Sequence, residues 1–277
     1  MSSNNESKIV FCAPFDDIRV RHIRLLHEAS RLGPVQVFLW DDATIRALTG
    51  RDPKFPAVER EYYLRSVRYV ENVTMVNGLT DADSLPGGVA GSAKMWVVHE
   101  SEDTSAKRTY CQAQGLEYKV FSEEDLAGFP AIDLDTNPSS SRKKVLVTGC
   151  YDWFHTGHVR FFEEVSELGD LYVVVGHDAN IRELKGQGHP MFSEKERVYI
   201  AGSIRFVKQA LISTGHGWLD AEPEIKRIKP DAYVVNEDGD KPIKRRFCEE
   251  NGIEYVVLKR LPRPGLPRRE STILRGS

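Results

Sequence analysis

The sequence predicts an α/β protein made of two doubly wound, mainly parallel sheets. Three observations support this fold class: short aliphatic runs alternate with amphipathic segments, this pattern occurs twice, and the chain of 277 residues is long enough for two ordinary domains. Parallel strands need a crossover connection between them, which the amphipathic segments provide as helices. We therefore expect two domains of one fold.

The duplication is visible when each residue of the first half is set against the residue 136 positions later. This register pairs identical residues over a long stretch, including Lys8 with Lys144, Asp16 with Asp152, His22 with His158, and Arg24 with Arg160. A register of 137 continues the match, pairing Phe55 with Phe192, Arg60 with Arg197, Tyr62 with Tyr199, and Cys111 with Cys248. A match of this length indicates that the two halves share one structure.

The second half shows its elements most clearly. We expect strands near 144–149, 171–176, 206–212, 232–236 and 254–258, and helices near 157–168, 194–202, 221–228 and 241–251. The polar, turn-rich sequence N-P-S-S-S at 137–141 is typical of a linker. We therefore place a first domain at 1–135, a linker at 136–143 and a second domain at 144–277, both Rossmann-like.

The first strand of the second half runs into a loop that carries two histidines. Residues 145–147 are aliphatic, a turn follows, and apolar residues at helical spacing begin at Val159. The loop therefore delivers His155 and His158 to the start of a helix, where unpaired N–H groups and the helix dipole favour an anion. Gly157 between them leaves room for a phosphate to approach the backbone.

The stretch from 148 to 158, T-G-C-Y-D-W-F-H-T-G-H, resembles the HxGH signature of the nucleotidyltransferase superfamily. It is similar to the cytidylyltransferase branch, which includes the ethanolamine-phosphate and glycerol-3-phosphate enzymes. This resemblance implies transfer of CMP from CTP to a phosphorylated or phosphonate small-molecule alcohol, with release of pyrophosphate. It implies catalysis by His155 and His158 and, at the nucleotide, the residues Thr148, Gly149, Tyr151, Phe154 and Gly157.

A second segment, with L-K-G at 184–186, proline at 190 and E-R at 196–197, resembles the K-G, P and E-R run of the same enzymes. It implies that Lys185 is catalytic, because an ammonium near the phosphates offsets charge on the α-phosphate and on the incoming anion. Thr49 stands opposite Lys185 in the first half. The segment also implies that Arg197 binds the nucleotide. Because Arg60 occurs at the same place in the first half, an alternative is that Arg197 holds a helix to the sheet through a carboxylate.

The last segment, at 260–272, partly matches the family run R-T-x-G-I-S-T-T. The resemblance assigns to the nucleotide the residues Arg263, Ser271 and Thr272 and, in an acidic turn after a strand, Asn236 and Asp238. Ser271 would open the last helix and bind the β- and γ-phosphates, or act as an ordinary N-cap. Extra residues separate Gly265 from Ser271, which leaves the choice between CTP and ATP open.

The first half departs from the motif where the chemistry would be. Opposite His155 and Gly157 it has Arg19 and Arg21, whereas His22 remains. We expect no catalysis from this half, and we expect Arg21 to fill the space of the phosphate; a regulatory nucleotide site is the alternative. The chain is predicted to form an internal pseudo-dimer with one active site, in which each half covers the other's apolar face. A homodimer of the whole chain remains a further possibility.

Composition excludes several classes of function. With 38 Lys plus Arg against 41 Asp plus Glu, the net charge of −3 favours no nucleic-acid partner. Apolar runs are far shorter than the roughly 20 residues of a membrane span. The four cysteines lack metal-type spacing and no signal peptide is visible, so we expect a cytoplasmic protein. The expected cofactor is Mg²⁺, bound to the nucleoside triphosphate.

Three rival functions remain at this stage. The first is adenylyl transfer from ATP on the same scaffold. The second is a nucleotide-binding sensor without turnover, which the altered first half would permit. The third is a zinc site formed by His155, His158 and His177, for which the sequence offers no clear fourth ligand.

Overall fold

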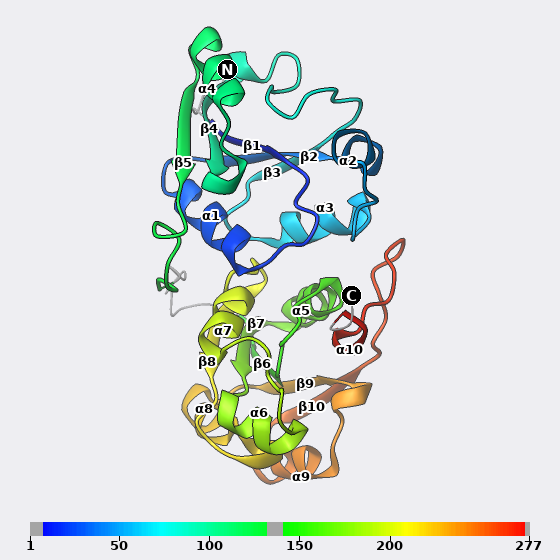
Figure 1. The fold of residues 1–277 in the computed structure, drawn as a ribbon. Coiled ribbons are helices and arrows are strands. Elements are labelled where there is room, and N and C mark those ends of the chain that lie inside the picture. Colours follow the sequence, from blue (N-terminus) through cyan, green and yellow to red (C-terminus); the bar gives the residue numbers. More distant parts are fainter. Residues whose placement is uncertain (1–7, 132–140, 275–277) are drawn as a thin grey trace. The chain divides into compact units, whose positions relative to one another are not determined.

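The computed structural model describes residues 8–131 and 141–274. The chain divides into two compact units, Met1–Gly128 and Phe129–Ser277. The predicted linker at 136–143 lies partly outside the described residues. Each unit is an α/β domain built on a parallel sheet (Figure 1), so the predicted fold class is confirmed.

The first unit has the strand order β3-β2-β1-β4-β5. Its strands are β1 (Lys8–Ala13), β2 (Val35–Trp40), β3 (Asn72–Val76), β4 (Ala93–His99) and β5 (Glu117–Phe121). Its helices are α1 (Val20–Ser30), α2 (Asp42–Thr49), α3 (Ala57–Ser66) and α4 (Ser105–Gln114), with the 3-10 turns η1 (Ala90–Ser92) and η2 (Glu100–Glu102). After Lys8, the central strand β1 is a buried apolar run, because helices cover both faces of a parallel sheet.

The second unit repeats this arrangement with the order β10-β9-β6-β7-β8. Its strands are β6 (Lys144–Gly149), β7 (Asp170–Val175), β8 (Val207–Ile212), β9 (Ala232–Asn236) and β10 (Glu254–Leu258). Its helices are α5 (Thr156–Leu168), α6 (Asp178–Lys185), α7 (Glu194–Gly202), α8 (Glu222–Ile228), α9 (Pro242–Glu250) and α10 (Ser271–Leu274), with the turns η3 (Gly217–Leu219) and η4 (Glu237–Gly239).

The predicted strands and helices of the second half agree with these elements to within a residue or two, but the sequence prediction missed α6. This helix has eight residues, and Ile181 is its main buried apolar side chain, so its periodicity is weak. It begins where the ring of His177 accepts a hydrogen bond from the Asn180 amide, a role that Ser, Thr, Asp or Asn more often fills.

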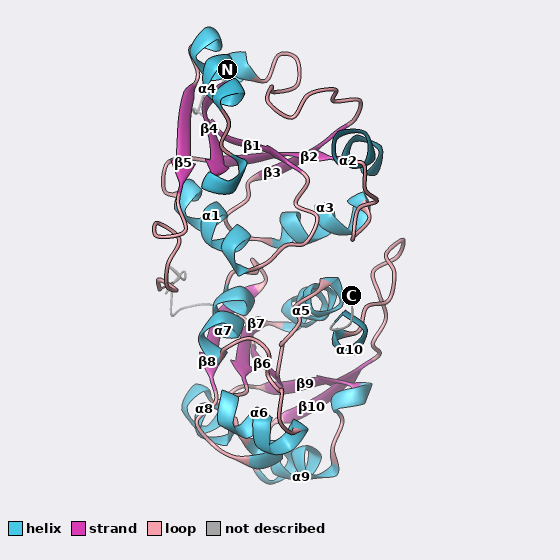
Figure 2. Ribbon diagram, viewed as in Figure 1, coloured by secondary structure: helices cyan, strands magenta, loops and turns pink. Residues whose placement is uncertain are grey.

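The central strand β6 marks the point where the strand order of the second sheet reverses. It pairs in parallel with β7 on one side and with β9 on the other. Figure 2 shows α5 and α7 on one face of this sheet and α8 and α9 on the other. Ligands in sheets of this kind bind beyond the carboxyl ends of the strands at the reversal point. The histidine-bearing loop leaves β6 at that place.

Candidate active site

The loop after β6 is a tight turn built on Gly149 and Tyr151. Tyr151 has a φ of 54°, in the left-handed region that few side chains adopt. A Cβ added at Gly149 would lie 2.7 Å from the Tyr151 ring, so only glycine fits beneath the turn. The buried Tyr151 ring packs edge-on against the rings of His158, at 5.4 Å, and Phe162, at 5.2 Å. The turn therefore holds the His158 ring in place through the Tyr151 ring.

The two histidines cap the first turn of α5 with their Nδ1 atoms. His155 Nδ1 accepts a hydrogen bond from the Gly157 amide at 3.0 Å, and His158 Nδ1 accepts one from the His155 amide at 3.3 Å. The rings stack with their centroids 4.0 Å apart. Because Nδ1 is an acceptor in both rings, the proton of each neutral imidazole resides on Nε2. Both histidines are thus fixed in the tautomer that donates through Nε2.

Burial keeps both imidazoles uncharged near neutral pH. It lowers the pKa of His155 to about 3, with the positive charges of Arg260 and Arg269 as further causes, and it lowers the pKa of His158 well below its usual value. His155 Nε2 is a buried donor without a hydrogen-bond partner in the described part of the chain. Leaving such a donor unpaired costs about 1–3 kcal/mol, so an acceptor oxygen from a ligand would stabilise this site.

Gly157 serves the histidine cap directly. A Cβ at this position would lie 2.8 Å from Cε1 and 2.9 Å from Nδ1 of His155. Any other residue would displace the imidazole from its capping position. The glycine is therefore needed for the geometry of His155, in addition to the open approach to the backbone that the sequence predicted.

A cleft of about 480 Å³ opens above this loop at the carboxyl ends of β6 and β9. This volume is within the usual range of small-molecule sites, about 300–1,000 Å³. Of the residues that the sequence assigned to the site, the cleft is lined by Thr148, Gly149, Tyr151, Gly157, His158, Lys185, Asn236, Asp238 and Ser271. The structure thus brings together residues from every segment that the resemblance singled out.

Comparison with known proteins agrees with this geometry. A family described as cytidylyltransferase-like matches residues 146–260. The FAD synthase of Pyrococcus horikoshii is 36% identical over 129 residues, which cover 44% of this chain and 83% of that protein. The chain belongs to the cytidylyltransferase-like nucleotidyltransferase family.

Two further relatives are longer proteins, of which this chain covers a smaller share. The bifunctional protein HldE of Campylobacter fetus is 26% identical over 256 residues, which cover 85% of this chain and 51% of that protein. HldE of a Nitratiruptor species is 34% identical over 124 residues, which cover 43% of this chain and 26% of that protein. The chain thus spans only about a quarter to a half of these HldE proteins.

Four predicted residues with described side chains do not line the cleft: His155, Phe154, Arg197 and Arg263. Arg197 has a fully buried guanidinium, which donates to the carbonyls of Phe192, Cys150 and Gly176 and to Asp178 Oδ1 at 2.6–2.9 Å. Four of its five N–H groups donate within the protein, so Arg197 fastens α7 to the strand ends, as the alternative interpretation expected. Its assignment to the nucleotide stays a prediction. Arg263 is exposed, and its nearest carboxylate is Glu163 of α5, at 3.4 Å. The cleft is lined by Arg260 in its place.

Three further predicted residues need comment. Phe154 packs its ring against His158 at 5.3 Å and Phe162 at 5.6 Å, which supports the histidine from the side. Ser271 is the first residue of α10 and donates its hydroxyl to the Trp153 carbonyl at 3.3 Å, so it is not simply an N-cap. Thr272 follows it, but its side chain lies outside the described part of the structure.

The sequence prediction also missed several residues of the cleft. These are Asn180, Asp220, Lys241, Lys244 and Arg260. Arg260 pairs with Asp238 at 2.6 Å, which ties the acidic turn to the last segment. Asn180 exchanges two hydrogen bonds with Gly217, Oδ1 accepting at 2.7 Å and Nδ2 donating at 3.1 Å, and so holds the loop of Trp218. A polar residue one turn into a helix carries no signal of such a distant contact.

The described residues contain no group of three or more His, Cys, Asp or Glu side chains placed to hold a metal ion. His177, considered for a zinc site, donates from Nε2 to the Gly215 carbonyl at 2.8 Å and caps α6 with Nδ1, which accepts from the Asn180 amide. Both of its ring nitrogens are therefore engaged within the protein. Over the same residues, no helix combines the length and apolar character that crossing a membrane requires.

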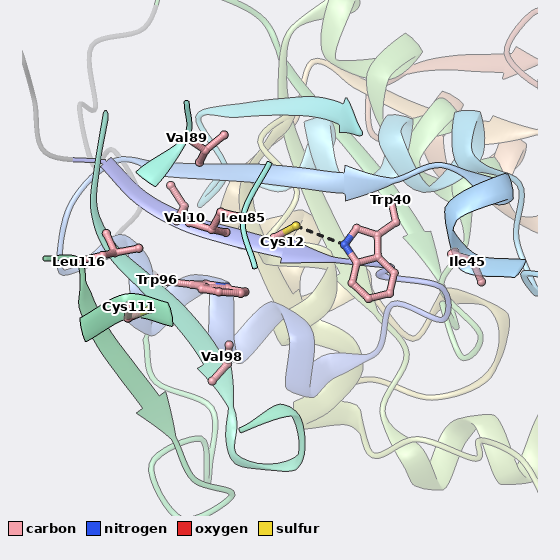
Figure 3. Close-up of a cluster of buried hydrophobic side chains, with 10 residues drawn as sticks. All are labelled: Val10, Cys12, Trp40, Ile45, Leu85, Val89, Trp96, Val98, Cys111 and Leu116. Carbon is pink, nitrogen blue, oxygen red and sulfur yellow. Dashed lines mark hydrogen bonds between the residues drawn. The ribbon is translucent and has the colours of Figure 1, made fainter. Parts of the chain in front are cut away.

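In the first unit, a buried tryptophan stands in the register of a glycine that lines the cleft of the second unit. Trp40 stands in the register of Gly176, and Cys12 in that of Thr148. Figure 3 shows the Trp40 indole in the core of the unit, with Nε1 bonded to Cys12 Sγ at 3.3 Å. Arg21, which the sequence predicted to fill the space of the phosphate, is exposed, and that role stays a prediction. Gly176 lines the cleft of the second unit, and a Cβ added there would lie 2.8 Å from Ile181 Cδ1.

Proposed function

We propose that the second unit transfers CMP from CTP to a phosphorylated or phosphonate small-molecule alcohol. An oxygen of the acceptor's phosphate attacks the α-phosphorus, the bond from the α-phosphorus to the β-phosphate oxygen breaks, and pyrophosphate leaves with that electron pair. A phosphomonoester with a second pKa near 6 is already an anion at pH 7. No general base is required, and positioning with charge stabilisation can supply the catalysis.

The observation that carries this proposal is the histidine pair. Each imidazole is neutral, each Nδ1 is occupied by a backbone amide, and the buried Nε2 of His155 lacks an acceptor within the described residues. Preformed donors at a helix start suit the charge that develops on phosphate oxygens during transfer. A neutral imidazole whose only free nitrogen carries a proton cannot remove a proton from the acceptor, which agrees with a mechanism without a base.

Cations around the cleft complete the site. Lys185 ends α6 and lines the cleft, where its ammonium would offset charge on the α-phosphate and on the acceptor. Arg260 lines the opposite segment. Mg²⁺ would arrive on the triphosphate, held mainly by its oxygens and by water, and would neutralise charge on the β- and γ-phosphates. The cleft carboxylates fit this role poorly, because Asp238 is paired with Arg260 and Asp220 accepts from Ser213.

A screen for pyrophosphate release tests the proposal. The full chain would be incubated with Mg²⁺, each of the four nucleoside triphosphates, and a panel of phosphorylated alcohols, sugar phosphates and phosphonates. We expect release with CTP that depends on one class of acceptor. Nucleotide binding without release under any combination would instead identify the chain as a nucleotide sensor.

Adenylyl transfer from ATP is the second candidate, and one observation favours it. The FAD synthase relatives carry the name of an enzyme whose product contains an adenylyl group, and they match this chain at 35–36% identity. The same histidines and lysine would serve either nucleotide, because their contacts are with phosphates. The ratio of kcat/KM for CTP and ATP in the screen decides between the two.

A further inference from the structure

Lys244 of α9 is a buried lysine that lines the cleft and that the proposed chemistry has not used. The residue is only 8% exposed. Its ammonium donates to Thr148 Oγ1 at 3.3 Å and lies 5.5 Å from the centre of the Tyr233 ring. An ammonium has three protons to donate, and one long hydrogen bond satisfies only part of this capacity.

No carboxylate within the described residues pairs with Lys244 at ion-pair distance. Asp220 is the main acidic group that acts on it, and Asp220 already accepts a hydrogen bond from Ser213 Oγ at 2.7 Å. Burial lowers the pKa of Lys244 below its usual value. A buried charge is costly unless it is paired, so this ammonium calls for a negatively charged oxygen.

In the first unit, the lysine at the corresponding position has both a hydrogen-bond acceptor and a carboxylate partner. Lys107 stands in the register of Lys244 and is equally buried, at 8% exposed. Its ammonium donates to the Glu102 carbonyl at 2.8 Å and lies 3.5 Å from Asp83 Oδ1. The protein thus supplies both oxygens in the first unit, where Trp40 fills the core. In the second unit the corresponding space is the open cleft.

We propose that Lys244 binds the phosphate or phosphonate group of the acceptor, an assignment that rests on the proposed nucleotidyl transfer. His158 reaches the cleft from α5, on one face of the sheet, whereas Lys244 reaches it from α9, on the opposite face (Figure 1). In an in-line displacement, the attacking and leaving oxygens lie on opposite sides of the α-phosphorus. With the triphosphate at the histidines, the anion site on the α9 side is that of the nucleophile.

The wall beside Lys244 has the features of an acceptor pocket. Trp218, about half exposed at 52%, lies on the rim, with Lys241 Nζ 5.1 Å from its ring centre. Asn180 fixes this loop through Gly217. The acceptor would place its anionic group on Lys244 and its organic part along the Trp218 face.

Equilibrium binding of inorganic phosphate, used as the probe, tests the assignment. Full-length wild-type protein and the variants Lys244→Met and Lys244→Gln would be titrated with phosphate by calorimetry, both alone and saturated with Mg²⁺ and the α,β-methylene analogue of CTP or ATP. We expect phosphate affinity to fall about ten- to hundredfold in both variants, as for loss of a hydrogen bond to a charged group. Affinity for the nucleotide analogue should change less than about threefold.

Lys107→Met is the matched control, because it removes the corresponding buried ammonium from the first unit. It should leave phosphate and nucleotide binding unchanged. Unchanged phosphate binding in both Lys244 variants, or no phosphate binding by the wild-type protein, would overturn the proposal. Weaker analogue binding with unchanged phosphate binding would place Lys244 at the triphosphate and overturn it as well. Absence of pyrophosphate release from every nucleotide refutes the proposed function separately, since these titrations need no turnover.

Discussion

The two units share one scaffold and differ at a few positions where only the second has an open site. Asp16 and Asp152 each accept from two consecutive backbone amides of the segment before the third helix. His22 and His158 each accept a hydrogen bond from the amide three residues earlier. These residues, common to both units, therefore hold the loop and helix in place in each.

The buried arginines show this most fully. Arg60 donates to the carbonyls of Phe55, Pro14 and Trp40 and to Asp42, and Arg197 donates to the four corresponding acceptors. The second unit has a cleft beside this arginine and the first has the buried Trp40, yet the arginine makes the same contacts in both. Its role is thus structural in both.

The differences between the units point to function. In the alignment of the two halves, His155 corresponds to Arg19, Lys185 corresponds to Thr49, and Gly176 corresponds to Trp40. Arg19 pairs with Asp17 at 2.9 Å, so it has become part of the first unit's own charge network. The second unit keeps the unpaired donor and the open space, and the first has replaced both with internal contacts.

The largest expected effect is on stability when the filled unit is emptied. Trp40→Gly should lower the free energy of unfolding by about 3–5 kcal/mol, because it leaves a cavity and removes the Cys12 contact. Urea unfolding measures this. Trp218→Gly, at a tryptophan that is 52% exposed, is the control and should cost far less. A loss below about 1 kcal/mol for Trp40→Gly would show that the indole is not the structural filling we describe.

The histidines test the distinction between scaffold and function directly. His155→Ala should lower kcat about a hundred- to a thousandfold, as for loss of one preformed donor, and His158→Ala should lose comparable activity. His22→Ala removes the capping contact of the first unit and should cost about 1 kcal/mol of stability without changing kcat. Near-normal turnover by His155→Ala would remove it from the chemistry.

Lys185, which has Thr49 in its place in the first unit, should have the next largest effect on catalysis. Lys185→Ala should weaken triphosphate binding and lower the rate, each by about ten- to a hundredfold, and Lys185→Arg should not restore both, because a planar fork does not replace a compact ammonium. Steady-state kinetics with varied nucleotide provides the measurement. Unchanged kinetics would assign Lys185 to the solvated end of α6.

The depressed histidine pKa values predict a pH dependence of stability. Burial lowers the pKa of His155 to about 3 and that of His22 to about 4, whereas the unfolded chain binds their protons near pH 6.5. Between these values the unfolded state holds more protons, so stability should fall as pH falls from about 6.5 towards 4. Chemical unfolding across this range should show a shallower decline in His22→Ala. An identical decline in that variant would argue against its buried neutral state.

The smallest expected signal is the absence of a second binding event. Calorimetric titration with the methylene analogue of CTP or ATP should give one site per chain, since Trp40 fills the first unit. Two equivalent sites would falsify the assignment of the first unit as a scaffold domain.

The sequence by itself determined the fold class, the duplication and the loop that carries the chemistry. These follow from local patterns: aliphatic strands, helical spacing, turn residues, and a motif of eleven consecutive positions from 148 to 158. Such signals depend on neighbours along the chain, so they can be read without coordinates. They also placed Lys185, Asn236 and Ser271 in segments that the structure gathers at one cleft.

Only the tertiary structure decided which arginine, lysine and glycine face that cleft. Arg197 is buried against carbonyls from three other segments, Arg260 replaces Arg263 at the cleft, and Lys244 lacks the oxygens that satisfy Lys107. Whether a charged side chain holds the fold or awaits a ligand depends on acceptors far away in the sequence. Burial and partner geometry set that balance, and neither is encoded in the residue type or its local spacing.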